Sequence, residues 1–272
     1  MASQDDSIGV KLNYWLKTLK TNFFRETSKG WRKLRAPKGM RELPPRYPQD
    51  FSPFTRTLWD QVKPYTMTTP ERVVNLERAV RHLVAAGIEG DIVECGVGAG
   101  GSMMAAAYTL LDLGRPDRRI LLYDTYRGMV RPTVEDVSVF GKSALRKFEK
   151  KLKDGECTWN NHPLETVRAN LARTGYPADK LLFIEGLVQD TLPLNDSASI
   201  AILRLDTNLY ESTKAECEFL MPKLAPGGIL IIDDYFRWRG QQKAIDEYLA
   251  AQGIRMFLVR LDDHSAIGVM PR

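Results

Sequence analysis

The sequence is poor in cysteine, in histidine and in long apolar runs. No stretch of its 272 residues approaches the roughly 18 uninterrupted apolar residues of a membrane span. The N-terminal segment also lacks a compact apolar block followed by a cleavage site. Three cysteines, Cys95, Cys157 and Cys217, have no metal-type spacing, as in proteins of a reducing compartment. We therefore expect a cytoplasmic protein without a structural disulfide.

The charge of the chain is unevenly distributed. The net charge is +5, but residues 1–41 contain ten Lys or Arg and three acids, so this arm carries +7 and the rest carries −2. The body is therefore not basic, and no nucleic-acid partner is expected. With 43% hydrophobic and 27% charged residues, the chain can bury the core of one globular domain.

The basic arm contains an amphipathic pattern. Its apolar residues recur at helical spacing: Ile8, Leu12, Trp15, Leu16, Leu19 and Phe23. Such a helix either binds an anionic membrane or a nucleic acid, or packs on its own body or on a second subunit. We favour packing, as the contact of a homo-oligomer, a dimer. The Pro-rich stretch "RELPPRYPQDFSPF" then acts as a semi-rigid connector. We assign residues 1–60 to the arm and connector, and 61–272 to the globular domain.

Helical and apolar segments alternate from residue 69 onward. "TPERVVNLERAVRHLVAAG" predicts a helix with Thr69 as N-cap and an end at Gly87. Continuous apolar runs follow, typical of parallel strands buried on both faces: "DIVECG", "RILLYD", "KLLFIEG", "SIAILRLD" and "GILIIDD". "RMFLVRL" and "SAIGVM" are close enough for an antiparallel hairpin. The sequence thus predicts an α/β fold, with a Rossmann-like, doubly wound, mostly parallel seven-stranded sheet and an antiparallel C-terminal hairpin.

Acids stand at the ends of these predicted strands, where doubly wound sheets bind ligands. They are Glu94, Asp124, Glu185, Asp206, Asp233 and Asp234. If the fourth and fifth strands are neighbours, Asp206, Asp233 and Asp234 converge, and a hard divalent cation would turn their repulsion into binding. Magnesium is the natural candidate. In the alternative interpretation, Asp233 and Asp234 only cap the following turn.

A glycine-rich turn follows the first predicted strand. In "ECGVGAGGSM", Gly96, Gly98 and Gly101 allow the backbone to approach a ligand before a helix that begins near Ser102. This pattern fits a nicotinamide cofactor or S-adenosylmethionine. Glu94 favours S-adenosylmethionine because an acid there faces a cationic methionine group, while Asp124 would accept ribose hydroxyls of either cofactor.

Several segments together resemble the macrocin O-methyltransferase family, whose members are metal-dependent enzymes that methylate sugar hydroxyls of natural products. The segments are "PYTMTTPERV", "VECGVGAGGSM", "YDTYRGM", "QDTLP", "LRLDTNLYEST" and "LAPGGILIIDDYFRWRGQQKAIDEY". The resemblance implies a class I S-adenosylmethionine-dependent methyltransferase that binds Mg²⁺. It also implies that residues 126–162 and the arm shape the acceptor pocket.

The resemblance assigns roles to residues of this chain. It implies a magnesium ion on Asp206, Asp233 and Asp234. The expected cofactor contacts come from Thr68, Thr69, Glu94, Gly96, Gly98, Ser102, Asp124 and Asp206.

One position departs from the family pattern. Where the family commonly has a second aspartate two residues after the first metal ligand, proposed as the general base, this chain has Asn208. An amide does not accept a proton at neutral pH. Three possibilities stay open: His162 takes the proton, water carries it away, or the acceptor is acidic, such as a phenol or enol.

We therefore expect Mg²⁺-dependent methyl transfer from S-adenosylmethionine to a hydroxyl of a small-molecule natural product, a sugar, polyketide or phenol, in secondary-metabolite or antibiotic biosynthesis. A nicotinamide-dependent oxidoreductase is the first alternative. A cofactor-binding subunit without catalytic activity is the second.

Overall fold

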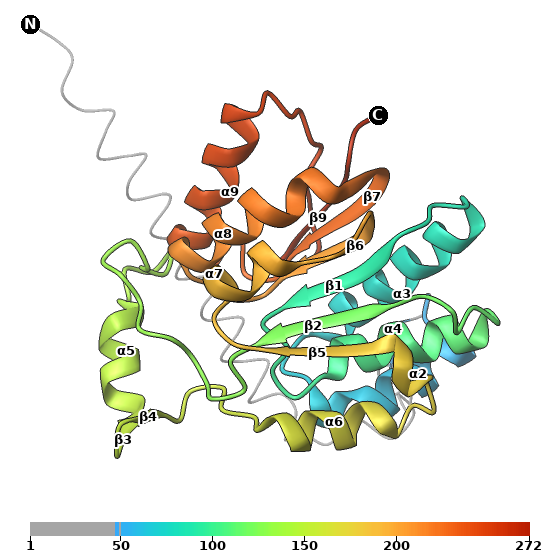
Figure 1. Ribbon diagram of the computed structural model, residues 1–272, viewed down its shortest axis with the longest axis horizontal. Coiled ribbons are helices and arrows are strands. Elements are labelled where there is room, and N and C mark those ends of the chain that lie inside the picture. The colour runs from blue at the N-terminus through green and yellow to red at the C-terminus, as the bar shows by residue number, and fades with distance from the viewer. Residues whose placement is uncertain (1–46, 49) are drawn as a thin grey trace, which may run out of the picture. The chain divides into compact units, whose positions relative to one another are not determined.

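Helices and parallel strands alternate along residues 47, 48 and 50–272, which the computed structural model describes (Figure 1). Phe51–Arg272 form one compact unit. Helix α2 (Pro53–Val62), which the sequence assigned to the connector, belongs to it, since Leu58 and Val62 join its buried core. The unit therefore starts ahead of the boundary we placed between residues 60 and 61. The predicted amphipathic helix and its role in dimerisation concern the arm, which lies outside the described residues.

The sheet has the predicted doubly wound arrangement. Its strands are β1 (Asp91–Cys95), β2 (Ile120–Asp124), β5 (Leu181–Glu185), β6 (Ile200–Leu205), β7 (Leu224–Ile232), β8 (Val259–Arg260) and β9 (Ala266–Val269). Seven strands lie in the order β5-β2-β1-β6-β7-β9-β8. Those from β5 to β7 pair in parallel, while β9 pairs antiparallel with β7 and β8. The predicted fold class, including the antiparallel C-terminal hairpin, is confirmed.

Helices cover both faces of the sheet (Figure 1). One layer contains α2, α3 (Pro70–Ala85), α4 (Gly101–Asp112) and α6 (Leu164–Ala172); the other contains α7 (Val188–Thr191), α8 (Tyr210–Leu220) and α9 (Arg239–Ala251). Short 3-10 helices occupy Lys63–Tyr65, Ala178–Lys180, Leu192–Leu194 and Met221–Lys223. Successive strand residues face opposite layers, so Ile92 packs under one and Val93 under the other. This two-sided burial explains the continuous apolar runs of the sequence.

The long connection after β2 folds beyond the carboxyl ends of β1 and β2 (Figure 1). It contains α5 (Ala144–Lys151) and a small hairpin of β3 (Leu152–Lys153) and β4 (Glu156–Cys157), which the sequence did not predict. A separate apolar cluster joins this connection to the loops after β6 and β7 through Trp159, Leu209 and Trp238. The connection is thereby fixed over the end of the sheet where ligands bind.

None of the helices in the described part of the chain is long and apolar enough to cross a membrane. Cys95, Cys157 and Cys217 are all buried with free thiols.

Gly96 is required by the close approach of two strand ends. Its φ is +84°, and a Cβ atom there would lie 2.5 Å from the backbone oxygen of Asp206. Gly98 also has a positive φ of +55°, but a Cβ there would meet nothing within 4 Å.

Gly96→Ala should therefore destabilise the protein far more than Gly98→Ala. Both substitutions incur the cost of a left-handed residue, about 1–2 kcal/mol, but only Gly96→Ala forces β1 and β6 apart. Urea unfolding followed by circular dichroism measures both. Equal losses of stability would contradict this assignment.

Candidate functional site

A cavity of about 420 Å³ opens at the carboxyl ends of the strands. The glycine turn after β1 forms one wall, and the loops after β6 and β7 form another. The connection after β2 closes it with Lys147 and Trp159, and the Lys147 Nζ lies 3.7 Å from the Trp159 ring centroid. One cavity therefore meets the glycine turn, the threonine segment before α3 and the ends of β6 and β7, which the sequence singled out.

The glycine turn is held in shape by Asp124. The Oδ2 atom of Asp124 accepts hydrogen bonds from the backbone N–H groups of Val97 at 2.7 Å and Gly98 at 3.2 Å. The Oδ1 atom accepts one from the N–H of Tyr126 at 2.8 Å. Asp124 thus positions the turn, a role that the sequence did not indicate, while still lining the cavity where a ribose was expected.

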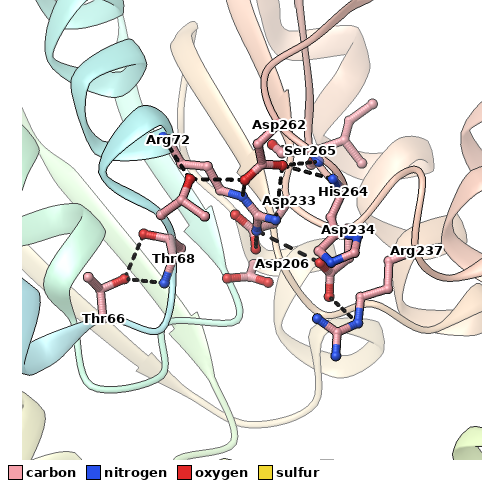
Figure 2. Close-up of polar contacts among 12 residues, drawn as sticks. Thr66, Thr68, Arg72, Asp206, Asp233, Asp234, Arg237, Asp262, His264 and Ser265 are labelled. Carbon is pink, nitrogen blue, oxygen red and sulfur yellow. Dashed lines mark hydrogen bonds and ion pairs between the residues drawn. The ribbon is translucent and has the colours of Figure 1, made fainter. Parts of the chain in front are cut away.

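The threonine segment before α3 also lines the cavity, and Figure 2 shows its Thr66 and Thr68 side chains in contact with one another. The Thr66 and Thr68 hydroxyls lie 2.9 Å apart. The Thr69 hydroxyl caps α3, as predicted, and also donates to Asp262 Oδ2 at 2.9 Å. The predicted cofactor residues that line the cavity are Thr68, Thr69, Gly96, Gly98, Ser102, Asp124 and Asp206.

Glu94 does not line the cavity, because it is fully buried behind it against Arg204. The Nη1 atom of Arg204 lies 2.5 Å from Glu94 Oε1 and 2.8 Å from Asp206 Oδ2. The Nη2 atom of the same guanidinium donates to Asp233 Oδ1. Glu94 and Arg204 are register partners on β1 and β6, so the sheet itself places them together. The direct cofactor contact proposed for Glu94 therefore has no support in this geometry.

Arg72 of α3 continues this row of charges (Figure 2). Its Nη1 atom lies 2.5 Å from Asp233 Oδ2, and its Nε atom lies 2.6 Å from Asp262 Oδ2. The sequence reasoning missed Arg72, Arg204 and Asp262. An arginine inside the apolar run "AILRLD" was the available signal for Arg204, while nothing in the sequence marked the other two.

The acids of this region do not ionise alike. Burial raises the pKa of Asp206, and its neighbours Asp233 and Asp234 raise it further. Burial and Asp233 likewise raise the pKa of Asp234, and burial raises that of Glu94 to about 7 despite Arg204. Burial opposes ionisation of Asp262 too, but hydrogen bonds from Arg72 and two backbone N–H groups prevail and lower its pKa. Burial and repulsion between neighbouring acids therefore oppose the ionisation of Asp206 and Asp234.

The three predicted magnesium ligands line the cavity together, but they do not form a coordination shell. Within the described residues, no group of three or more His, Cys, Asp or Glu side chains could hold a metal ion. Arg72 and Arg204 engage both oxygens of Asp233, so guanidinium groups stand where a cation was expected. Carboxylate oxygens are still the ligands that a hard cation prefers, and the magnesium site stays a prediction.

Asn208, at the position where the family commonly has a base, and His162, the candidate substitute, line the same cavity. Asn208 has a φ of +69° and only 7% of its surface is exposed. Asparagine tolerates this left-handed conformation better than most residues. Its Oδ1 atom is buried without a hydrogen-bond partner in the described chain. The amide is therefore available to a ligand as an acceptor but not as a base.

Comparison with known proteins identifies the family of this chain. The family model described as macrocin O-methyltransferase (TylF) matches residues 51–268. The chain belongs to the macrocin O-methyltransferase family. The resemblance predicted from the sequence is thereby confirmed, and the predicted enzyme class, an O-methyltransferase, is that of the family.

The individual proteins that this family member resembles are named as O-methyltransferases. It is 38% identical over 177 residues to the 8-demethyl-8-(2,3-dimethoxy-alpha-L-rhamnosyl)-tetracenomycin-C 4'-O-methyltransferase of Streptomyces olivaceus, covering 65% of this chain and 64% of that one. It is 30% identical to the mycinamicin III 3''-O-methyltransferase of Micromonospora griseorubida, covering 73% of this chain and 75% of that one. The solved O-methyltransferase NovP matches with a TM-score of 0.67 and 28% identity, over 76% of this chain and 83% of its own.

Replacement of Arg204 by methionine should destabilise this macrocin O-methyltransferase family member by about 3–5 kcal/mol, the usual cost of leaving buried charges unpaired. Without the guanidinium, the pKa of Glu94, which burial already raises to about 7 in the folded wild type, would rise further above its unfolded value. Stability would then be lost as pH rises through that interval. Thermal unfolding between pH 5 and 8 tests this prediction, which fails if the loss in the variant is independent of pH.

Proposed function

We propose that this protein transfers the methyl group of S-adenosylmethionine to a hydroxyl of a small-molecule natural product, with a sugar-bearing antibiotic precursor as the acceptor class. One observation carries the proposal: the glycine turn and the acid-rich strand ends open into a single cavity. The relatives named for methylation of a rhamnosyl tetracenomycin and of mycinamicin III support the acceptor class. The family membership favours this function over a nicotinamide-dependent oxidoreductase.

The protein contributes alignment and charge to such a reaction. In methyl transfer, an oxygen lone pair attacks the sulfonium methyl from the side opposite the sulfur, so position decides the rate. Thr68, Ser102 and the glycine turn would hold the cofactor, whose positive charge is attracted by the surplus carboxylates. Trp159 and Trp238 line the cavity, with ring centroids 6.1 Å apart, and would form an apolar wall for the acceptor.

We further propose that the reaction depends on a bound magnesium ion. Asp206 and Asp234 would hold it as carboxylates, because a bound cation would offset the burial and the repulsion from neighbouring acids that raise the pKa of both. Asp233 would join them by releasing one of its two arginine contacts. When bound, the ion would lower the pKa of an acceptor hydroxyl and fix its orientation.

Turnover on defined acceptors tests the proposed function. We expect methylated product, detected by mass spectrometry, with S-adenosylmethionine and either mycinamicin III or the rhamnosyl tetracenomycin. Cofactor binding without product across these and a catechol such as 3,4-dihydroxybenzoate would favour a non-catalytic subunit. Binding of NADH in a fluorescence titration would favour the oxidoreductase.

Removal of metal with EDTA should abolish this activity, and added Mg²⁺ should restore it. Asp206→Ala, Asp233→Ala and Asp234→Ala should each lose activity while S-adenosylmethionine binding, measured by calorimetry, persists. Asp262→Ala is the matched control for the arginine network, because Asp262 pairs with Arg72 but is not a proposed ligand. Full turnover in metal-free buffer would rule out the magnesium site.

Asn208→Asp tests how acidic the acceptor is. If the natural acceptor is a phenol or enol, the wild type should methylate catechol faster than the sugar hydroxyl. The substitution should then raise the sugar rate, by up to the 10²- to 10⁴-fold typical of a general base. Rates on matched sugar and catechol acceptors across pH provide the measurement. The hypothesis fails if the wild type is fast on the sugar and the substitution slows it.

A further inference from the structure

Two cations on the wall of the cavity take no part in the arginine network around Asp233. Lys147 comes from α5 and Arg237 from the loop after β7, and both line the cavity. Within the described part of the chain, the Lys147 ammonium has no ion pair and lies instead on the face of the Trp159 ring. The Arg237 Nε atom is 4.0 Å from Asp234 Oδ2, beyond hydrogen-bond distance. Both side chains therefore have donors that a ligand can use.

The wall that carries these cations is fixed by backbone contacts. The N–H of Val139, in the connection after β2, donates to the carbonyl of Arg237 at 2.9 Å. Trp159 and Trp238 are 8% and 5% exposed, and their ring centroids lie 6.1 Å apart. The Lys147 Nζ atom is 3.7 Å from the Trp159 ring centroid, and Arg237 directly precedes Trp238. The two cations and the tryptophan pair therefore belong to one wall whose parts are held together.

The sign of the charge differs between the strand ends and this wall. The acids Asp206, Asp233 and Asp234 line the cavity at the strand ends, whereas α5 contains four Lys or Arg and one acid among its eight residues. Partial burial lowers the pKa of Lys147, and the positive charge of Arg237 lowers it further against the smaller effect of Asp234. An anion bound beside both cations would relieve their repulsion.

We propose that Lys147 and Arg237 bind an anionic group of the methyl acceptor, a carboxylate or a phosphate, so that the acceptor is an acidic rather than a neutral glycoside. This inference rests on the proposed methyl transfer and specifies its acceptor class. The planar guanidinium matches the paired oxygens of either anion. An apolar part of the acceptor would pack on Trp159 and Trp238, while its reacting hydroxyl would face Asn208 Oδ1, which is buried without a partner in the described residues.

Calorimetry on matched ligands tests the site without turnover. Phenyl β-D-glucuronide and phenyl β-D-glucoside differ in a carboxylate against a hydroxymethyl group, and α-D-glucose 1-phosphate and methyl α-D-glucoside differ in a phosphate against a methyl ether. The protein is loaded with S-adenosylhomocysteine in buffer with EDTA, so that no metal ion binds the anion. We expect the acidic member of at least one pair to bind about tenfold more tightly, as one charged hydrogen bond provides.

The two pairs also identify the anion. A preference confined to the glucuronide indicates a carboxylate, and a preference confined to the glucose phosphate indicates a phosphate. Equal binding within both pairs, or no binding of any of the four ligands, would overturn the inference.

Variants assign the preference to these two side chains. Arg237→Gln and Lys147→Met should each weaken binding of the acidic ligand about tenfold and leave the neutral ligand unchanged. Arg146→Gln and Lys150→Met are the matched controls, because both residues are exposed cations of α5 that do not line the cavity. The controls should bind as wild type does. If they lose as much affinity as the two test variants, the effect belongs to the general charge of α5, and the site is wrong.

The carboxylate of the cofactor is the other anion that could enter this cavity. The affinity for S-adenosylhomocysteine should therefore be measured in each variant, and we expect it to be unchanged. If Arg237→Gln or Lys147→Met weakens S-adenosylhomocysteine binding and leaves glycoside binding intact, the cations bind the cofactor, and the inference fails.

Turnover separates this inference from the proposed function. With S-adenosylmethionine and Mg²⁺, the preferred acidic glycoside should be methylated with a lower KM than its neutral partner, and Arg237→Gln should raise that KM with kcat nearly unchanged. If the acidic ligand binds through these cations but is not methylated, the proposed function fails and the anion site remains as a binding site. If both partners are methylated with equal KM and the variant changes nothing, the anion site fails and the proposed function remains.

Discussion

A single buried guanidinium, that of Arg204, fixes the relative positions of three strand ends. It contacts Glu94 on β1, Asp206 after its own strand and Asp233 after β7. Burial opposes its charge, but Asp233, Asp206 and Glu94 outweigh that cost and raise the pKa of Arg204. Because a buried ion group is stable only when its partners are complete, small displacements of these strand ends are penalised. The strand ends beneath the cavity are therefore held by the ion pairs of Arg204 as well as by the backbone hydrogen bonds of the sheet.

The same arrangement sets the electrostatic character of the cavity. Arg72 and Arg204 neutralise part of the acidic cluster. The pKa values of Asp206 and Asp234 nevertheless remain raised, by burial and by the neighbouring Asp233. A cationic ligand entering here gains attraction and relieves repulsion between the acids. Both a sulfonium cofactor and a divalent metal ion have that charge. The arginines hold the acids together at the place where a cation was expected.

The sequence was most informative where local pattern determines structure. Apolar runs such as "AILRLD" and "GILIIDD" predicted the parallel strands because both faces of the sheet are covered. The Thr69 cap and the turn at Gly96 also depend only on residues next to them in the sequence, and the structure contains both. Arg72 pairs with Asp233 and Asp262, which are far away along the chain, so no spacing rule could reveal it. The burial of Glu94 behind Arg204 depended on the register of β1 against β6, which single-sequence patterns do not contain.

Asn208 bears on the chemistry of the acceptor. If no base were present, the acceptor would itself have to be acidic, and a phenol or enol would be favoured over a sugar alcohol. Asn208 lines the cavity, and its Oδ1 atom is buried without a hydrogen-bond partner in the described chain, so this atom can accept a hydrogen bond from an acceptor hydroxyl but cannot take its proton. A carboxylate at this position would do both, and the amide therefore separates the orientation of the hydroxyl from the removal of its proton.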